Sequence, residues 1–545
     1  MKALQHEMIL ASAGSGKTYA LTNRFVRLLA HGAAPERIVA LTFTRKAAGE
    51  FFDEILKKLA SAATDTTKAE KLAVEIGAPT LGAADFLRLL RVVVTAMPRL
   101  NLGTLDGFFA RVVQNFPLEL GLDGEFQILE ASAAARERRR VLRQMFTAAG
   151  EPDAAQREFI EAFKRATFGV EEKRLTRVLD QFLDEHGEKF LAASAAAQWG
   201  DPGRIWPEGC AWLASVDGRE AAAQALRAAW ATEPWNEKQR ERVENFFAAL
   251  EEWEPGAVFP GPLEYLLKNA LAAWPALEEV TIERKKVALS EDARAALRGV
   301  VEGIAGAELT RRLEMTRGVF AVLRSYEMTY DALVRRAGRL TFADVLRRLL
   351  PGAGAPALAQ QSDAVGRDVE EARLLIDWRL DAKFDHWLLD EFQDTSYEQW
   401  SVLRNLIDEA VQDAEGRRSL FYVGDVKQAI YAWRGGDPRL FREIFNHYNA
   451  SAPGKIVEGR LDVSWRSTPA VIAMVNAVFG AAEVLGASVP VAAAKEWNRE
   501  WRAHTSADEA AVGFAELRHA PDEEGRFAET LKILREVEPA RRGLT

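Results

Sequence analysis

Residues 8–18 read Met-Ile-Leu-Ala-Ser-Ala-Gly-Ser-Gly-Lys-Thr, and they give the clearest indication of the fold class. It starts as a short apolar run and ends in a glycine-rich turn. Leu21, Phe25 and Leu28 then recur at helical spacing, which predicts a strand, a loop and a helix in succession. Residues 11–18 match the phosphate-loop pattern G-x-x-x-x-G-K-[ST], except that Ala11 occupies the first glycine position. The segment therefore predicts a nucleotide-binding α/β domain. The alternative is a Gly-rich turn that binds no nucleotide.

The residue types in this loop suit a bound phosphate chain. Glycines allow the backbone to curl so that successive N–H groups and the helix N-terminus point at an anion. Lys17 supplies a positive charge for the β- and γ-phosphates, and the Thr18 hydroxyl can ligate Mg²⁺. We expect the following residues to contact ATP: Ala11, Ser12, Ala13, Gly14, Ser15, Gly16, Lys17 and Thr18.

A second segment, Leu388-Leu389-Asp390-Glu391, predicts hydrolysis of that nucleotide. An apolar strand here ends in adjacent carboxylates, where Asp390 would hold Mg²⁺ and Glu391 would orient and deprotonate a water. A kinase has no need of a water-activating glutamate, so the pair favours an ATP hydrolase. The alternative is a solvated acidic strand end.

A third segment, Val423-Gly424-Asp425-Val426-Lys427-Gln428, is also expected to end a strand. Gln428 would sense the γ-phosphate from the neighbouring strand end. Tyr431, Trp433 and Arg434 follow directly and offer flat surfaces for nucleobases, although core packing is the alternative for the two aromatic residues.

The overall pattern predicts several domains, because 545 residues correspond to roughly three to four domains of ~150 residues. The first ~110 residues alternate apolar strands with helices, which predicts a parallel sheet covered on both faces. Residues 115–335 show helical periodicity with almost no strand signal, and strand–helix alternation resumes after the loop at 351–356. Near the end we expect a strand at 512–517 and a helix at 527–537.

Composition excludes several classes of protein. With 48% hydrophobic and 28% charged residues, neither a disordered chain nor a membrane bundle is expected, and no apolar run reaches the ~20 residues of a bilayer span. We therefore expect a cytoplasmic protein. The single cysteine, Cys210, excludes thiolate clusters, so any metal should have oxygen ligands. The net charge of −9 implies that nucleic acid would be bound in a local groove rather than over the whole surface.

Taken together, the motifs resemble superfamily 1 DNA helicases of the UvrD/RecB type. Besides the three segments above, residues 42–48 (Thr-Phe-Thr-Arg-Lys-Ala-Ala) and 464–467 (Ser-Trp-Arg-Ser) follow the order found in that family. The amino-acid sequence of the phosphate loop and the large helical insertion look most like those of the RecB and AddA helicase–nuclease subunits. The resemblance spans residues 1–480.

The resemblance implies roles for further residues. Gln5 would read the adenine ahead of the phosphate loop, and Arg466 would reach the γ-phosphate from the second motor domain. Phe43, Thr44 and Thr104 would contact single-stranded DNA.

It also implies an architecture and a function. We expect a RecA-like P-loop motor domain at 1–114 and 336–460, an all-helical insertion at 115–335, and an incomplete second RecA-like domain at 461–545. ATP- and Mg²⁺-dependent 3′ to 5′ translocation on single-stranded DNA would serve double-strand break repair or recombination, acting on DNA ends with an AddB/RecC-like second subunit. The alternatives are an ATP-gated DNA-binding scaffold subunit and a P-loop enzyme of another class, such as a kinase.

The chain is further expected to be the N-terminal part of a longer protein. The family's later motifs and a RecB-type nuclease signature are not found before Thr545. An isolated chain of this kind would bind ATP, hydrolyse it slowly and unwind nothing.

Overall fold

The structure is a computed structural model that divides into two compact units. Unit 1 comprises Met1–Gly121, Asp344–Pro351 and Asp368–Thr545, and unit 2 comprises Leu122–Ala343 and Gly352–Arg367. The three-part division expected from the sequence stays a prediction. The described residues are 4–120, 122, 126–146, 154–166, 175–193, 195–214, 218–231, 233–350, 369–432, 435–539 and 541–542.

Unit 1 is built on a six-stranded parallel sheet with the order β10-β1-β9-β8-β2-β3. This confirms the predicted α/β fold class. Three of its strands, β2, β8 and β9, have only buried residues, as a strand covered on both faces requires. The strands are β1 (His6–Ala11), β2 (Ile38–Thr42), β3 (Asn101–Thr104), β8 (His386–Leu389), β9 (Ser419–Gly424) and β10 (Ile456–Leu461).

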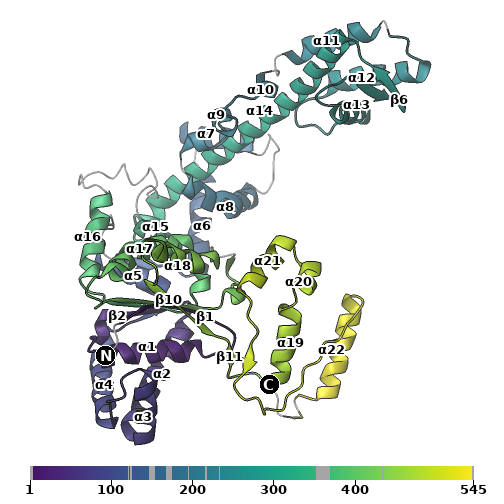
Figure 1. Cartoon of the computed structure of the whole chain (residues 1–545). Helices are drawn as coiled ribbons and strands as arrows, with labels where there is room; N and C mark the ends of the chain where they lie inside the picture. The colour runs from purple at the N-terminus through teal and green to yellow at the C-terminus, as the bar shows by residue number, and fades with distance from the viewer. Residues whose placement is uncertain are drawn as a thin grey trace. The chain divides into compact units, whose positions relative to one another are not determined.

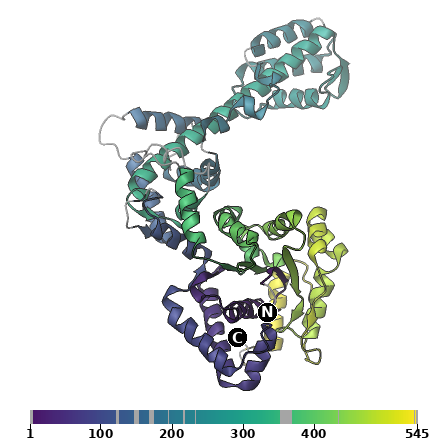
Figure 2. The same ribbon diagram turned by 60° about the vertical axis from the view of Figure 1, so that its left-hand side comes forward.

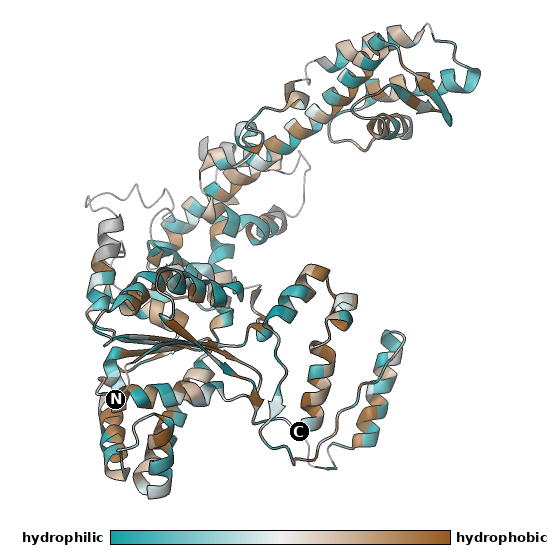
Figure 3. Cartoon of the chain, viewed as in Figure 1, coloured by the Kyte–Doolittle hydropathy of each residue, from teal (hydrophilic) through white to brown (hydrophobic). Residues whose placement is uncertain are grey.

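Helices cover both faces of this sheet, with α1 to α4 on one side and α5, α16, α17 and α18 on the other (Figure 1). Much of the centre of the sheet is brown, the hydrophobic colour of Figure 3, whereas the helices carry both colours. The helices are α1 (Lys17–Ala30), α2 (Arg45–Thr64), α3 (Thr66–Glu75), α4 (Ala83–Ala96), α5 (Leu105–Asn115), α15 (Phe342–Leu349), α16 (Val369–Asp381), α17 (Tyr397–Gln412) and α18 (Arg439–Ser451).

Unit 2 is dominated by helices, among them the 40-residue α14 (Glu291–Tyr330), about 60 Å long at 1.5 Å per residue (Figures 1 and 2). Its first half shares a core with α11, α12 and α13, where Trp230 and Trp253 are buried. Its second half packs on α6, α7 and α8. The shorter helices are α6 (Ala131–Phe146), α7 (Ala154–Ala166), α8 (Leu175–Ala192), α9 (Pro202–Ile205), α10 (Ala211–Ala214), α11 (Arg219–Ala231), α12 (Glu237–Glu252) and α13 (Gly261–Ala272).

Short strands interrupt the helices of unit 2, although almost no strand signal was recognised in this part of the sequence. An antiparallel hairpin joins β5 (Glu279–Ile282) to β6 (Lys285–Ala288), and β4 (Gln127–Ile128) pairs with β7 (Arg339–Leu340). These segments have two to four residues, which is too short for a period-two pattern to be recognised.

The last part of unit 1 contains helices and one two-residue pairing, β11 (Val463–Ser464) with β12 (Thr505–Ser506). The strand expected at 512–517 is wrong, since these residues form no ladder and Val512 is 98% exposed. An apolar alternation needs a neighbouring strand to pair with, and the described residues provide none here. The expected C-terminal helix is confirmed as α22. The helices are α19 (Pro469–Phe479), α20 (Ala482–Ser488), α21 (Val491–Glu500) and α22 (Glu523–Val537).

Among the described helices, none is by itself long and apolar enough to cross a membrane. One bent pair, α19 with α20, meets the criteria of length and composition when taken together.

Candidate nucleotide and nucleic-acid site

The predicted site residues gather at the carboxyl edge of the sheet. The phosphate loop follows β1, the acidic pair follows β8, and Asp425 follows β9. Phe43 follows β2 on the same edge, and Thr104 ends β3. Because all six strands are parallel, residues at their carboxyl ends meet along one edge, where ligands bind in open α/β sheets.

The phosphate loop has the curled backbone that its glycines predict. Gly14 and Gly16 have φ angles of 71° and 90°, in the left-handed region that glycine favours. Ser15 closes the turn, because its hydroxyl donates to the Ser12 carbonyl at 2.7 Å and accepts from the Ser12 N–H at 3.1 Å. The N-terminus of α1 follows directly, so the loop matches a phosphate cradle.

The segment after β10 is bonded to this loop. The Ser12 N–H donates to the Leu461 carbonyl at 3.1 Å, and the Trp465 N–H donates to the Gly14 carbonyl at 2.9 Å. A Cβ built on Gly14 would lie 2.8 Å from the Arg466 Cβ. The structure thus brings Arg466, expected at the γ-phosphate, against the loop.

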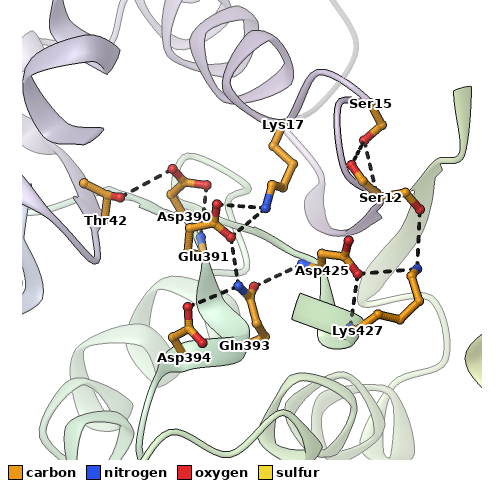
Figure 4. A network of polar contacts seen from close by, with 10 residues as sticks. All are labelled: Ser12, Ser15, Lys17, Thr42, Asp390, Glu391, Gln393, Asp394, Asp425 and Lys427. Atoms are coloured by element: carbon orange, nitrogen blue, oxygen red, sulfur yellow. Dashed lines mark hydrogen bonds and ion pairs between the residues drawn. The ribbon is translucent and has the colours of Figure 1, made fainter. Parts of the chain in front are cut away.

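Lys17 and Glu391 form an ion pair at the centre of the site (Figure 4). The Lys17 Nζ lies 2.6 Å from Glu391 Oε2 and 2.8 Å from Oε1. The two groups expected to act on the γ-phosphate and on the attacking water therefore contact each other directly, although the chain separates them by 373 intervening positions.

Asp390 lies beside this pair, with its Oδ1 accepting from the Glu391 N–H at 3.0 Å and its Oδ2 3.4 Å from the Thr42 hydroxyl. Burial, followed by the negative charge of Glu391, raises the pKa of Asp390 to about 6. A carboxylate that water solvates poorly gains from a cation, so its position suits the expected Mg²⁺ ligand.

Glu391 has a φ of 48°, which is unusual for a residue other than glycine. Its side chain also accepts from Gln393 Nε2 at 2.8 Å, and Gln393 Oε1 accepts from the Asp425 N–H at 3.0 Å. No role was predicted for Gln393 from the sequence. Its neighbour Asp394 is buried, and burial together with the Glu391 charge raises the pKa of Asp394 to about 6.

Lys427 and His504 were also missed. The Lys427 Nζ lies 3.4 Å from both the Ser12 hydroxyl and Asp425 Oδ1. His504 Nδ1 contacts the same hydroxyl at 3.4 Å. Lys427 directly precedes Gln428, the predicted γ-phosphate sensor, so its place in that motif could have indicated a role in the site. No sequence pattern marks His504.

Other predicted nucleotide contacts lie in exposed positions. Thr18 is exposed on the first turn of α1, and Gln428 is exposed at the end of the 3-10 turn Val426–Gln428. Gln5 is exposed before β1, and its carbonyl accepts from the Arg24 guanidinium at 2.6 Å. Their roles toward ATP stay predictions.

Two of the predicted DNA-contacting residues meet on this edge. The rings of Phe43 and Tyr431 lie 4.4 Å apart between centroids, tilted by 36°. Thr44 and Thr104 are N-caps, of α2 and α5, with hydroxyls that accept from backbone N–H groups at 3.1 and 3.0 Å. The remaining two predicted contacts, Trp433 and Arg434, lie outside the described residues.

Comparison with known proteins identifies related sequences. Residues 2–252 and 304–449 match the UvrD/REP helicase N-terminal domain. Proteins named as the A subunit of an ATP-dependent helicase/nuclease also match, with 28% identity over 512 residues in Desulforudis audaxviator (strain MP104C) and 25% over 530 residues in Pelotomaculum thermopropionicum (strain DSM 13744 / JCM 10971 / SI). A third relative of the same name, from Streptococcus equi subsp. zooepidemicus (strain MGCS10565), is 23% identical over 507 residues.

Each match covers 87% of this chain but only 37–38% of the relative, so the chain spans less than two-fifths of the length of these curated relatives. The family match itself covers well over half of the chain, including the phosphate loop, the acidic pair and the β9 turn. The chain therefore belongs to the UvrD/REP helicase family.

Proposed function

We propose that the chain is the ATP-hydrolysing motor portion of a DNA helicase that translocates on single-stranded DNA in double-strand break repair or recombination. The observation that carries this proposal is the shared edge of the sheet, where the Lys17–Glu391 pair and the Phe43–Tyr431 aromatic pair follow neighbouring strands. A nucleotide hydrolase without a nucleic-acid substrate has no need of a pair of aromatic rings beside its acidic pair.

The site suits ATP with Mg²⁺, by the chemistry of its donors. The curled backbone at Gly14 and Gly16 would hold the phosphate chain together with Lys17, and Asp390 with Thr18 would hold Mg²⁺ through oxygen atoms. A bound Mg²⁺ would neutralise phosphate charge. Glu391 would orient and deprotonate the attacking water.

Gln428 and Arg466 would respond to the γ-phosphate, and Gln5 would contact the adenine. Arg466 has the strongest support, because it lies against the phosphate loop at Gly14.

For DNA, Phe43 and Tyr431 would stack on bases, joined by Trp433 and Arg434 of the same segment. Thr44 and Thr104, being helix caps at the same edge, would present helix N-termini to the DNA backbone.

The remaining proposals rest on the family and on the names of the relatives. Because those relatives are named as one subunit of a helicase/nuclease, we propose an AddB/RecC-like partner for this chain and DNA ends as the substrate. We also propose 3′ to 5′ polarity, the cytoplasm as the site of action, and the three-part division into motor domain, insertion and second motor domain.

One experiment tests the function. ATP turnover by the purified chain should rise when single-stranded DNA is added, and it should fall to a slow residual rate in Glu391→Gln while ATP binding persists. Binding of ATP and DNA with no turnover under any condition would favour the scaffold role instead. Phosphate transfer to a small molecule would favour a kinase.

A further inference from the structure

Gln393 is the least exposed polar side chain in contact with Glu391, at 1% exposure. Its amide uses both ends at once. The nitrogen donates to Glu391 Oε2 at 2.8 Å and to Asp394 Oδ2 at 3.3 Å, and the oxygen accepts from the Asp425 N–H at 3.0 Å (Figure 4).

These partners leave one orientation for the amide. The two carboxylates can only accept, so the nitrogen must face them, and the backbone N–H of Asp425 can only donate, so the oxygen must face it. A glutamate here would bring a third negative charge against Glu391 and Asp394, and an apolar side chain would remove one hydrogen bond from each of the three polar partners.

The space around this amide is equally restricted. Gly424 ends β9 directly beside the amide. A Cβ on Gly424 would overlap Gln393 Oε1 and would lie 2.8 Å from the Phe441 ring. A glycine at this position therefore leaves room for the Gln393 amide.

Glu391 needs such a support. Its backbone is in the left-handed region, which costs about 1 kcal/mol and persists only where the surroundings hold it. The side-chain hydrogen bonds described for its carboxylate come from Lys17 and Gln393. Under the proposed function, Lys17 turns to the phosphates of ATP, and Gln393 then remains to hold the carboxylate.

We infer that Gln393 is a positioning residue that fixes the carboxylate of Glu391 for water activation and ties it to the end of β9 through Asp425. This inference rests on the proposed ATP hydrolysis. It assigns Gln393 no contact with ATP, so its loss should slow turnover without weakening nucleotide binding.

The test is single-turnover ATP hydrolysis by the full chain with single-stranded DNA, combined with titration of a fluorescent ATP analogue. Gln393→Met, close in volume to glutamine, should lower the rate constant about 100-fold and change the analogue's Kd by less than about twofold. The double variant Glu391→Gln/Gln393→Met should be no slower than Glu391→Gln alone, because Gln393 acts through Glu391.

Gln399 provides a matched control. It is a glutamine six positions further on, whose amide caps α17 by accepting from the Ser396 N–H at 3.1 Å. Gln399→Met should reduce stability and leave the rate constant unchanged. If Gln393→Met does not fold, Gly424→Ala displaces the amide from the other side and should reproduce the slow turnover.

The outcomes separate this inference from the proposed function. A chain whose turnover falls in Glu391→Gln but not in Gln393→Met or Gly424→Ala overturns the inference alone. Additive losses in the double variant, or a Kd that weakens in step with the rate, overturn it as well. A chain without any ATP turnover overturns both the inference and the proposed function.

Discussion

His6, the first residue of β1, should make unit 1 sensitive to mild acid. Its Nδ1 accepts a hydrogen bond from the Leu420 N–H of β9 at 3.0 Å, and the side chain is buried. Burial, followed by the positive charges of Lys455 and Arg24, lowers the pKa of His6 from 6.5 to about 4. A protonated imidazole could no longer accept from Leu420, so the folded state requires the neutral ring.

The sign and the size of the effect follow from this shift. Below pH 6.5 the His6 imidazole is protonated in the unfolded chain, whereas in the folded chain it stays neutral down to about pH 4. The free energy of unfolding therefore falls as the pH falls from 6.5 to 4. At pH 5, which is about 1.5 pH units below the ordinary histidine pKa of 6.5, the free energy of unfolding should be lower by about 2 kcal/mol, at about 1.36 kcal/mol per unit. His6→Asn should keep an acceptor for Leu420 and remove the titration.

Amide hydrogen exchange measured on a peptide spanning β9 provides the assay. Between pH 7 and pH 5, the protection of β9 should fall about 30-fold further in the unsubstituted chain than in His6→Asn, since each 1.4 kcal/mol is about tenfold. Comparing both proteins at each pH removes the intrinsic pH dependence of exchange, and peptides from α14 in unit 2 serve as the internal reference. Equal changes in the two proteins would refute the reasoning.

Three further predictions concern the site. Lys17→Ala should abolish ATP turnover and weaken nucleotide binding, because it removes the charge facing the phosphates; normal turnover would mean the site is misassigned. Phe43→Ala should weaken binding of a single-stranded oligonucleotide by about 1–3 kcal/mol in a fluorescence anisotropy titration, with ATP binding retained, and an unchanged Kd would show that the ring only packs on Tyr431. Gly14→Ala should weaken nucleotide binding in an equilibrium titration, because alanine is strained at a φ of 71° and its Cβ would lie 2.8 Å from that of Arg466; an unaltered affinity would contradict this.

Local patterns predicted much of the fold of unit 1. The apolar runs before Ala11 and Asp390 are strands, and the glycine-rich turn leads into a helix, because a strand, its loop and its helix are encoded within about 30 residues of chain. The fold class is therefore confirmed. The run at 512–517 shows the limit of such patterns, since a strand also needs a partner that its own residues do not specify.

The site shows the same division between local and tertiary information. Lys17 and Glu391 could be predicted from their motifs, but their ion pair joins segments far apart in the sequence and was not foreseen. Gln393 stands two positions after Glu391, yet its role depends on the Asp425 N–H at the end of another strand. The N-cap role of Thr44, by contrast, can be predicted from the sequence, because threonine directly before a helix is a common helix start signal.

The Lys17–Glu391 ion pair also bears on which anions the phosphate loop can retain. The two side chains are only 13% and 32% exposed, so the pair is worth more than one on the open surface. An incoming anion must therefore compete with the Glu391 carboxylate, which is already paired with the Lys17 ammonium group. A single weakly held anion, such as chloride or acetate, loses that competition. A polyphosphate, bound by many backbone N–H groups at once, can displace Glu391, and the carboxylate then becomes available only when such a ligand is present.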